Sequence, residues 1–96
     1  MAKRIVKSAG LVLRLYVAGN APNSVRAIAN IRAFCDEHFT AGHELEVVDL
    51  LTSPQRGVAD GIIVTPTLIK LSPPPVTRVI GSLSDTQQLL LTLGHR

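Results

Sequence analysis

Residues 11–23 read LVLRLYVAGNAPN, and this stretch decides the fold. Its first seven residues form a short apolar run with branched and aromatic members, which predicts a buried strand ending in a turn. Residues 24–40 follow with a helical stripe of apolar side chains at spacings of three and four, formed by Val25, Ile28, Ile31, Cys35 and Phe39. We expect Asn23 or Ser24 to cap this helix and Gly42 to end it.

The middle of the chain predicts one more strand, a short helix and a pair of strands. Residues 44–50 alternate polar and apolar before becoming continuously apolar, which suits a strand with one end in solvent. Pro54 favours the start of a short surface helix within residues 52–61. Residues 67–71 and 76–80 have the pattern of strands, and we expect them to pair antiparallel.

The C-terminal part of the chain predicts a final helix. Ser84 and Gln87 form a capping-box pattern ahead of four leucines, and the helix should run to about Gly94. The expected order is therefore βαβαββα. We expect a single domain over residues 1–96, because no linker, repeat or low-complexity segment divides the chain. The first βαβ unit should have a right-handed crossover.

The composition indicates a folded chain and disfavours two kinds of partner. Hydrophobic residues make up 46% and charged residues 18%, the proportions of a globular domain. The net charge is only +3 and the basic residues are scattered, so we expect no nucleic-acid surface. Aromatic side chains for base stacking are also few, namely Tyr16, Phe34 and Phe39. No run of about twenty apolar residues occurs, and we expect no membrane span.

Cys35 is the only cysteine, so the chain can form no internal disulfide. This favours a reducing, cytoplasmic location, and Arg14 interrupts the apolar run that imitates a signal peptide. Cys35 and His38 have a spacing that can supply two metal ligands, but no further cysteine follows and we expect no metal site. Asp49, at the end of a predicted strand, is interpreted as a turn carboxylate, with a functional carboxylate as the alternative.

The predicted order resembles thioredoxin, with Thr65-Pro66-Thr67 before the third strand and Gly-Ser-Leu-Ser before the last helix. In thioredoxins a cysteine pair flanks Gly-Pro at the start of the first helix, where the helix N-terminus lowers the pKa of a thiol. The corresponding turn here is Asn20-Ala21-Pro22-Asn23, and asparagine cannot attack a disulfide. Pro66 stands where thioredoxins use a cis-proline; a bulge or the start of a strand is the alternative.

A closer resemblance covers residues 11–93 and is carried by eight short segments in a fixed order. They are LYVAGN at 15–20, PNSVRA at 22–27, VD at 48–49, PQ at 54–55, TPTL at 65–68, PPPV at 73–76, IG at 80–81 and LSD at 83–85. Together these segments are similar to the KaiB family of bacterial clock proteins.

The resemblance implies a function and a set of partners. It implies a non-enzymatic adaptor without a cofactor, which binds the hexameric ATPase KaiC and modulates its phosphorylation and ATPase cycle in a circadian or stress-timing system. KaiA-like and SasA-like clock proteins are further partners by the same resemblance. The family is metamorphic: it alternates between a homo-oligomeric βαββααβ ground state, a dimer or tetramer, and a monomeric thioredoxin-like state that binds KaiC. The order predicted from the residues is the second state.

The resemblance also implies which residues contact the partner. These are Pro54 and Gln55, Lys70, and the loop Pro73-Pro74-Pro75, while Thr65-Pro66 is a candidate cis-proline and switch. Two departures from cyanobacterial members affect these expectations: residues 56–61 are poorer in charge, and the chain stops at Gly94-His95-Arg96. Two alternative functions stay open, a thioredoxin-like redox or glutathione-dependent protein that uses Cys35, and a constitutive homo-oligomer with a single fold.

Overall fold

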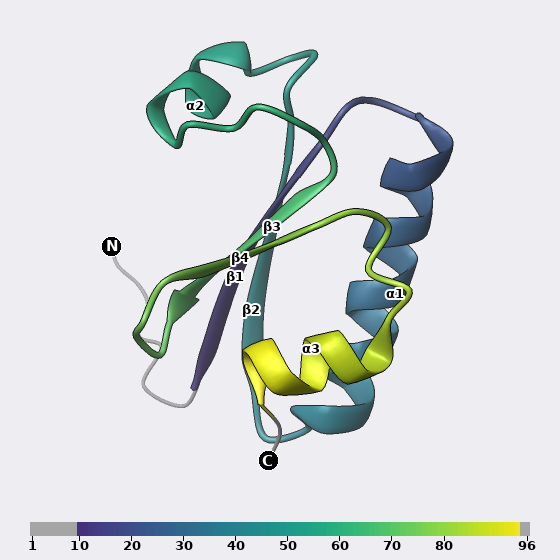
Figure 1. Cartoon of the computed structure of the whole chain (residues 1–96), viewed down its shortest axis with the longest axis vertical. Helices are drawn as coiled ribbons and strands as arrows, with labels where there is room; N and C mark the ends of the chain where they lie inside the picture. Colours follow the sequence, from purple (N-terminus) through teal and green to yellow (C-terminus); the bar gives the residue numbers. More distant parts are fainter. Residues whose placement is uncertain (1–9, 95–96) are drawn as a thin grey trace.

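The central strand β1 (Leu11–Val17) organises the sheet. In the computed structural model, which describes residues 10–94, β1 pairs parallel with β2 (His43–Asp49) and antiparallel with β3 (Thr67–Ser72). The hairpin strand β4 (Thr77–Ile80) pairs antiparallel with β3, so the strand order is β2-β1-β3-β4 (Figure 1). The expected βαβαββα order is confirmed, and the structure is the thioredoxin-like alternative and not the βαββααβ arrangement.

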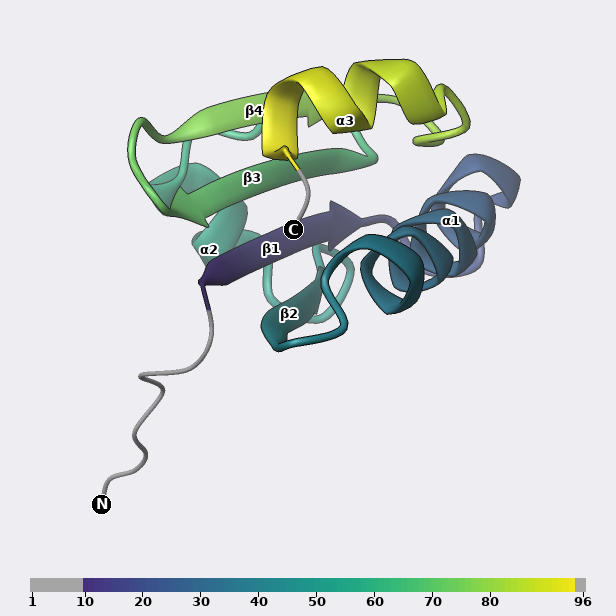
Figure 2. The same cartoon turned by 90° about the horizontal axis from the view of Figure 1, so that it is seen from below.

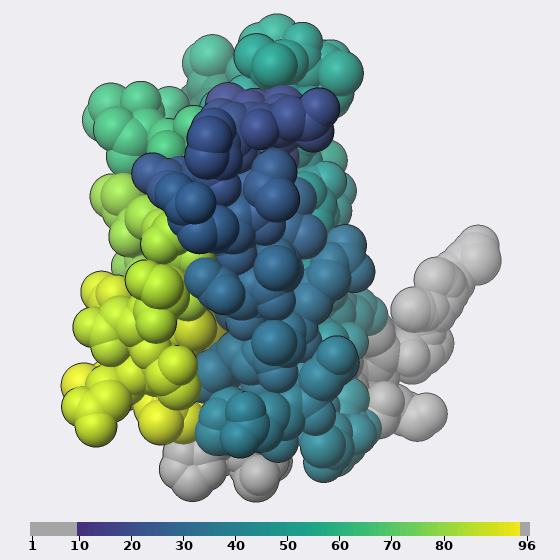
Figure 3. Space-filling model, turned by 90° about the vertical axis from the view of Figure 1, so that its right-hand side faces the viewer, coloured from purple at the N-terminus to yellow at the C-terminus, as the bar shows by residue number. Residues whose placement is uncertain are grey.

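Alternation of side chains along β1 separates two faces of the sheet. One face packs against α1 (Pro22–His38) and α3 (Thr86–Leu93), and α2 (Pro54–Ala59) lies on the other face (Figure 2). Figure 3 shows α1 and α3 side by side. The main core fills the α1 and α3 face and includes four residues of β1: Leu11, Leu13, Leu15 and Val17. A smaller cluster of Tyr16, Val48 and Ile69 fills the α2 face.

The first helix begins earlier than expected and is capped differently. It starts at Pro22 after Ala21, with no side-chain cap, so the prediction of an Asn23 or Ser24 cap is wrong. Proline suits the first turn because that position needs no N–H donor. The buried Ser24 hydroxyl instead accepts a hydrogen bond from the Ala18 N–H at 3.1 Å. Val25, placed on the apolar stripe by its spacing, is half-exposed, because the buried face of the helix begins with Ser24 and Ala27 instead.

The last helix ends where expected but its cap is one residue later. The carboxylate of Asp85 accepts a hydrogen bond from the Gln88 N–H at 3.1 Å, so Asp85 is the N-cap and not Ser84. The Ser84 hydroxyl contacts that of Ser82 at 3.3 Å and is directed into the preceding loop. Gly94 follows the helix with φ +80°, a conformation that favours glycine.

The strand bounds differ from the expected ones by about one residue at three places. β2 covers 43–49 instead of 44–50, β3 extends to Ser72, and β4 begins at Thr77 instead of position 76. Pro66 precedes the first residue of β3, and the Thr65-Pro66 peptide bond is cis. The structure thus combines the two interpretations of this proline, since it is a cis-proline at the start of a strand.

Candidate docking surface

The structure separates the residues that the sequence analysis grouped as partner contacts. Pro54 and Gln55 are exposed at the start of α2, and the loop Pro73-Pro74-Pro75 is exposed between β3 and β4. The register puts these groups at opposite ends of the sheet, because Thr67 pairs with Tyr16 and Ser72 pairs with Val12 (Figure 1). They therefore cannot form one compact site.

Lys70 lies between these two ends and is not a surface residue. It is only 6% exposed, in β3. Alternation along the strand places its side chain on the same face as Leu68, the face covered by α1 and α3. In this conformation the Lys70 side chain is therefore not accessible for the direct partner contact that was expected.

The end of the sheet that carries α2 presents a group of exposed apolar side chains that the sequence analysis did not single out. The exposed fractions are 72% for Leu51, 81% for Val58, 93% for Ile63 and 46% for Val64. All four lie where β1 and β2 finish and β3 begins. We call these four residues, together with Pro54 and Gln55, the α2 surface. The sequence pattern of residues 62–71 is strand-like throughout, but β3 begins only at Thr67, so Ile63 and Val64 lie outside the sheet.

The α2 surface is uncharged, because the two charged residues of this region form ion pairs with side chains of the sheet. Between positions 50 and 69 only Arg56 and Asp60 carry charge. Both are paired with side chains of the sheet, as the next contacts show. A group of large exposed apolar side chains at one end of a folded domain is typical of an interaction surface.

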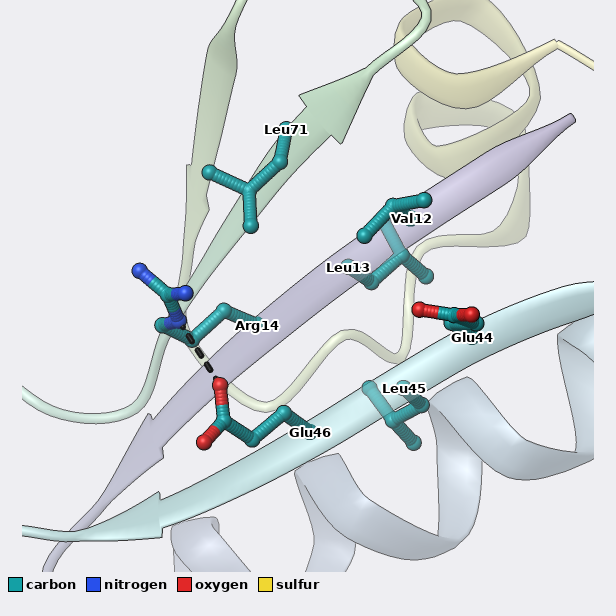
Figure 4. A pocket seen from close by; sticks show the side chains of 7 residues that line it. All are labelled: Val12, Leu13, Arg14, Glu44, Leu45, Glu46 and Leu71. Carbon is teal, nitrogen blue, oxygen red and sulfur yellow. Dashed lines mark hydrogen bonds and ion pairs between the residues drawn. The ribbon is translucent and has the colours of Figure 1, made fainter. Parts of the chain in front are cut away.

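Glu46 of β2 is the centre of the first set of contacts. Its carboxylate accepts hydrogen bonds from Arg56 at 2.6 and 3.0 Å and from Arg14 Nε at 3.0 Å. Figure 4 shows Arg14 and Glu46 facing each other on adjacent strands, at one side of a shallow hollow of about 380 Å³. The Arg56 hydrogen bonds, aided by Arg14, lower the pKa of Glu46 to about 2.

Asp60, directly after α2, receives the second set of contacts. Its carboxylate accepts hydrogen bonds from Arg14 at 3.0 Å and from the Tyr16 hydroxyl at 2.5 Å. Arg78 of β4 donates to the backbone oxygens of Asp60 and Gly61. The Tyr16 hydrogen bond, and then Arg14, lower the pKa of Asp60. Burial, and then the Asp60 carboxylate, raise the pKa of Tyr16.

The turn that replaces the thioredoxin cysteines lies at the same end of the sheet. Asn23 accepts a hydrogen bond from Arg26 at 2.6 Å, within α1. The Asp49 carboxylate accepts from the backbone N–H groups of Gly19 at 3.0 Å and Leu51 at 2.9 Å. Its interpretation as a turn carboxylate is confirmed.

Cys35 is inaccessible and weakly acidic. It is fully buried in the main core, and burial raises the pKa of its thiol to about 11. A thiol with this pKa is protonated at neutral pH and is a poor nucleophile. Among residues 10–94 no cluster of three metal-ligating side chains occurs, and no described helix is long and apolar enough to cross a membrane.

These observations define a thioredoxin-like domain whose active-site turn lacks the redox cysteine pair. The family model described as "KaiB domain" matches residues 14–95. The chain belongs to the KaiB family and is a homologue of circadian clock oscillator proteins. It is 49% identical over 82 residues to the circadian clock oscillator protein KaiB of Prochlorococcus marinus (strain MIT 9313), covering 85% of this chain and 69% of the relative. The protein of that name from Nostoc punctiforme (strain ATCC 29133 / PCC 73102) is also 49% identical, covering 85% and 79%.

Solved structures with the same fold include the N-terminal domain of SasA and several thioredoxins. The N-terminal domain of Synechococcus elongatus SasA superposes with a TM-score of 0.73 at 22% identity, covering 96% of this chain and 87% of that domain. Mitochondrial thioredoxin 3 of Saccharomyces cerevisiae superposes with a TM-score of 0.70 at 11% identity, covering 91% and 79%. At these identities the likeness shows the thioredoxin-like fold alone.

Proposed function

We propose that this protein is a non-enzymatic adaptor that docks, in its thioredoxin-like conformation, on a KaiC-type hexameric ATPase and modulates its phosphorylation and ATPase cycle. The observation that carries the proposal is the α2 surface, whose residues are exposed and uncharged and include four large apolar side chains. The free energy falls when a protein partner covers a surface of this kind, because apolar side chains are removed from water. Sequence relatives named as circadian clock oscillator proteins supply the biological setting.

The contacts are proposed to centre on the α2 surface, with Pro54 and Gln55 at its edge. The loop Pro73-Pro74-Pro75 lies at the far end of the sheet, so it contacts the partner only if the interface extends along β3. We propose that Lys70 affects binding through its place inside the sheet, since its buried side chain cannot contact the partner directly. The Thr67 hydroxyl donates to the Val64 carbonyl at 2.6 Å and so ties the segment that carries Ile63 and Val64 to the start of β3. Thr65-Pro66 lies between these two residues and is the proposed switch.

A second part of the proposal concerns the other clock partners and the second fold. A SasA-like protein is a further partner that the family resemblance implies, and we propose that it competes for the same docking site on the ATPase. KaiA-like proteins are candidate partners of the assembled complex. The free protein would also populate a βαββααβ homo-oligomer in the cytoplasm. Two folds of one chain require free energies within a few kcal/mol, and subunit contacts supply a difference of that size.

Complex formation with a KaiC homologue from the same source tests the proposal. The two proteins are mixed with ATP or ADP, incubated for hours to days, and analysed by sedimentation velocity. Wild-type protein should co-sediment with the hexamer. A matched pair of variants locates the contact: Leu51→Ser removes an exposed leucine of the α2 surface, and Leu91→Ser removes one from α3, 88% exposed. Binding should be lost for Leu51→Ser only. No complex under any nucleotide condition or incubation time would refute the proposal.

A further inference from the structure

The helix α2 is too short to fix its own position. It has six residues, and its preceding residue Ser53 makes no side-chain capping hydrogen bond. Isolated helices of this length are unstable in water. Its position on the sheet, and with it the position of the α2 surface, must therefore come from contacts with the strands.

Packing accounts for one of these contacts. Gly57 lies against Leu50, and a Cβ atom at this glycine would stand 2.6 Å from a methyl carbon of that leucine. This close approach brings α2 down onto the sheet. Neutral and backbone contacts also hold this region: the Tyr16 hydroxyl donates to the Arg56 carbonyl, and Arg78 donates to the backbone oxygens of Asp60 and Gly61.

Three ion pairs add to these contacts; they link Arg56, Glu46, Arg14 and Asp60 in that order, and the backbone of residues 56–60 closes them into a ring. Glu46 binds Arg56 within α2, Asp60 after α2 binds Arg14, and Arg14 returns to Glu46. Arg14 lies on β1 and Glu46 is its register partner on β2. The ring therefore attaches Arg56, in the last turn of α2, and Asp60, directly after the helix, to two adjacent strands. Glu46 is the member that joins the two halves, since it alone accepts hydrogen bonds from both arginines.

We propose that Glu46 is the positioning residue of the α2 surface: by bridging Arg14 and Arg56 it fixes the orientation in which α2 presents Leu51, Val58, Ile63 and Val64 to a partner. This inference rests on the proposed function for the identity of the partner. A preorganised surface binds more tightly because less conformational freedom is lost on association. Breaking the ring loosens α2 without removing any side chain of the surface.

The chain offers a matched control for Glu46. Glu44 lies two residues earlier on the same strand and the same face, and it is exposed. Within residues 10–94 its side chain makes no hydrogen bond or ion pair, and it lines the hollow next to Glu46 (Figure 4). Glu44→Gln and Glu46→Gln therefore remove the same charge from the same sheet face, and only the second breaks the ring.

Amide hydrogen exchange of the isolated protein and affinity for the KaiC homologue test the proposal together. The amides of Asp60 and Ile62 donate to the α2 carbonyls of Arg56 and Gly57. Glu46→Gln should speed exchange at these two amides by about fivefold and weaken binding by a similar factor, the scale of a partly exposed ion pair. Arg56→Gln should do the same, and the double variant should add little to either. Glu44→Gln should leave both quantities unchanged, and amides of β1 should not respond to any of these changes.

Three results would overturn the inference. They are unchanged exchange at Asp60 and Ile62 in Glu46→Gln, equal acceleration throughout the chain, and faster exchange in α2 with unchanged affinity. Failure of the wild-type protein to bind the ATPase overturns the partner on which the inference depends. In that case exchange at Asp60 and Ile62 still decides whether Glu46 positions α2.

Discussion

The hydroxyl of Tyr16 lies 2.5 Å from the carboxylate of Asp60, a residue 44 positions further along the chain. The hydroxyl also lies 3.1 Å from the backbone oxygen of Arg56, so it reaches both the helix α2 and the residue after it. Tyr16→Phe should lower the free energy of unfolding by about 1–2 kcal/mol, because a largely buried hydrogen bond to a charged group is lost. Urea unfolding measures this change. In an Asp60→Asn background the same substitution should cost less, and an equal cost would contradict the pairing.

Tyr16 is the only tyrosine, so its ionisation can be followed by ultraviolet absorbance without interference. Burial and the Asp60 carboxylate both favour the neutral phenol, and the pKa should lie above its ordinary value of 10.0. Asp60→Asn should bring the midpoint down, because the negative neighbour is removed. Circular dichroism at each pH shows whether the chain is still folded. A wild-type midpoint at or below 10 in folded protein would count against the contact.

The Glu46 carboxylate predicts a loss of stability in acid. Its pKa is about 2 in the folded chain against an ordinary 4.5, so its contribution is complete above pH 4.5 and is lost as the pH falls towards 2. The midpoint of urea unfolding should therefore fall across this interval. Glu46→Gln should show a shallower fall, because it has no charge to lose. If Glu44→Gln flattened the profile as much, the effect could not be assigned to Glu46.

The buried thiol predicts low reactivity and no role in binding. Cys35 has a pKa of about 11, so labelling by a thiol reagent at pH 8 should be slow in the folded protein and fast in urea. Cys35→Ala should lower the free energy of unfolding by about 1 kcal/mol, since it leaves a small cavity in the core. It should leave affinity for the ATPase unchanged. Loss of binding in this stable variant would instead support the alternative function that uses Cys35.

The element order was predictable because each element carries its own periodicity. Residues 11–17 show a buried strand from their composition alone, and β1 has those bounds. Caps were less predictable because neighbouring residues compete for them. Ser84 and Asp85 are both good N-caps, and the structure uses Asp85, one position closer to the first helical residue.

The ring of charges could not be predicted from the sequence, since its members come from three separate elements. Arg14 and Asp60 are 46 residues apart, and their contact depends on where α2 settles on the sheet. The family resemblance identified Lys70 as a partner contact but could not show whether its side chain is exposed. Its burial in β3 depends on the register of that strand with β1 and β4. The sequence analysis also missed the α2 surface. Its apolar residues look like core residues until the fold places them outside.

The central claim is that the thioredoxin-like conformation docks through the α2 surface, and methyl NMR of the bound protein tests it most directly. The chain is labelled at leucine, valine and isoleucine methyl groups and mixed with the unlabelled KaiC homologue. Signals of Val58, Ile63 and Val64 should broaden or shift on binding, while those of Leu91 on α3 and Val25 on α1, also exposed, should stay in place. Perturbation confined to Leu91 and Val25, with Val58 and Ile63 unchanged, would contradict the account.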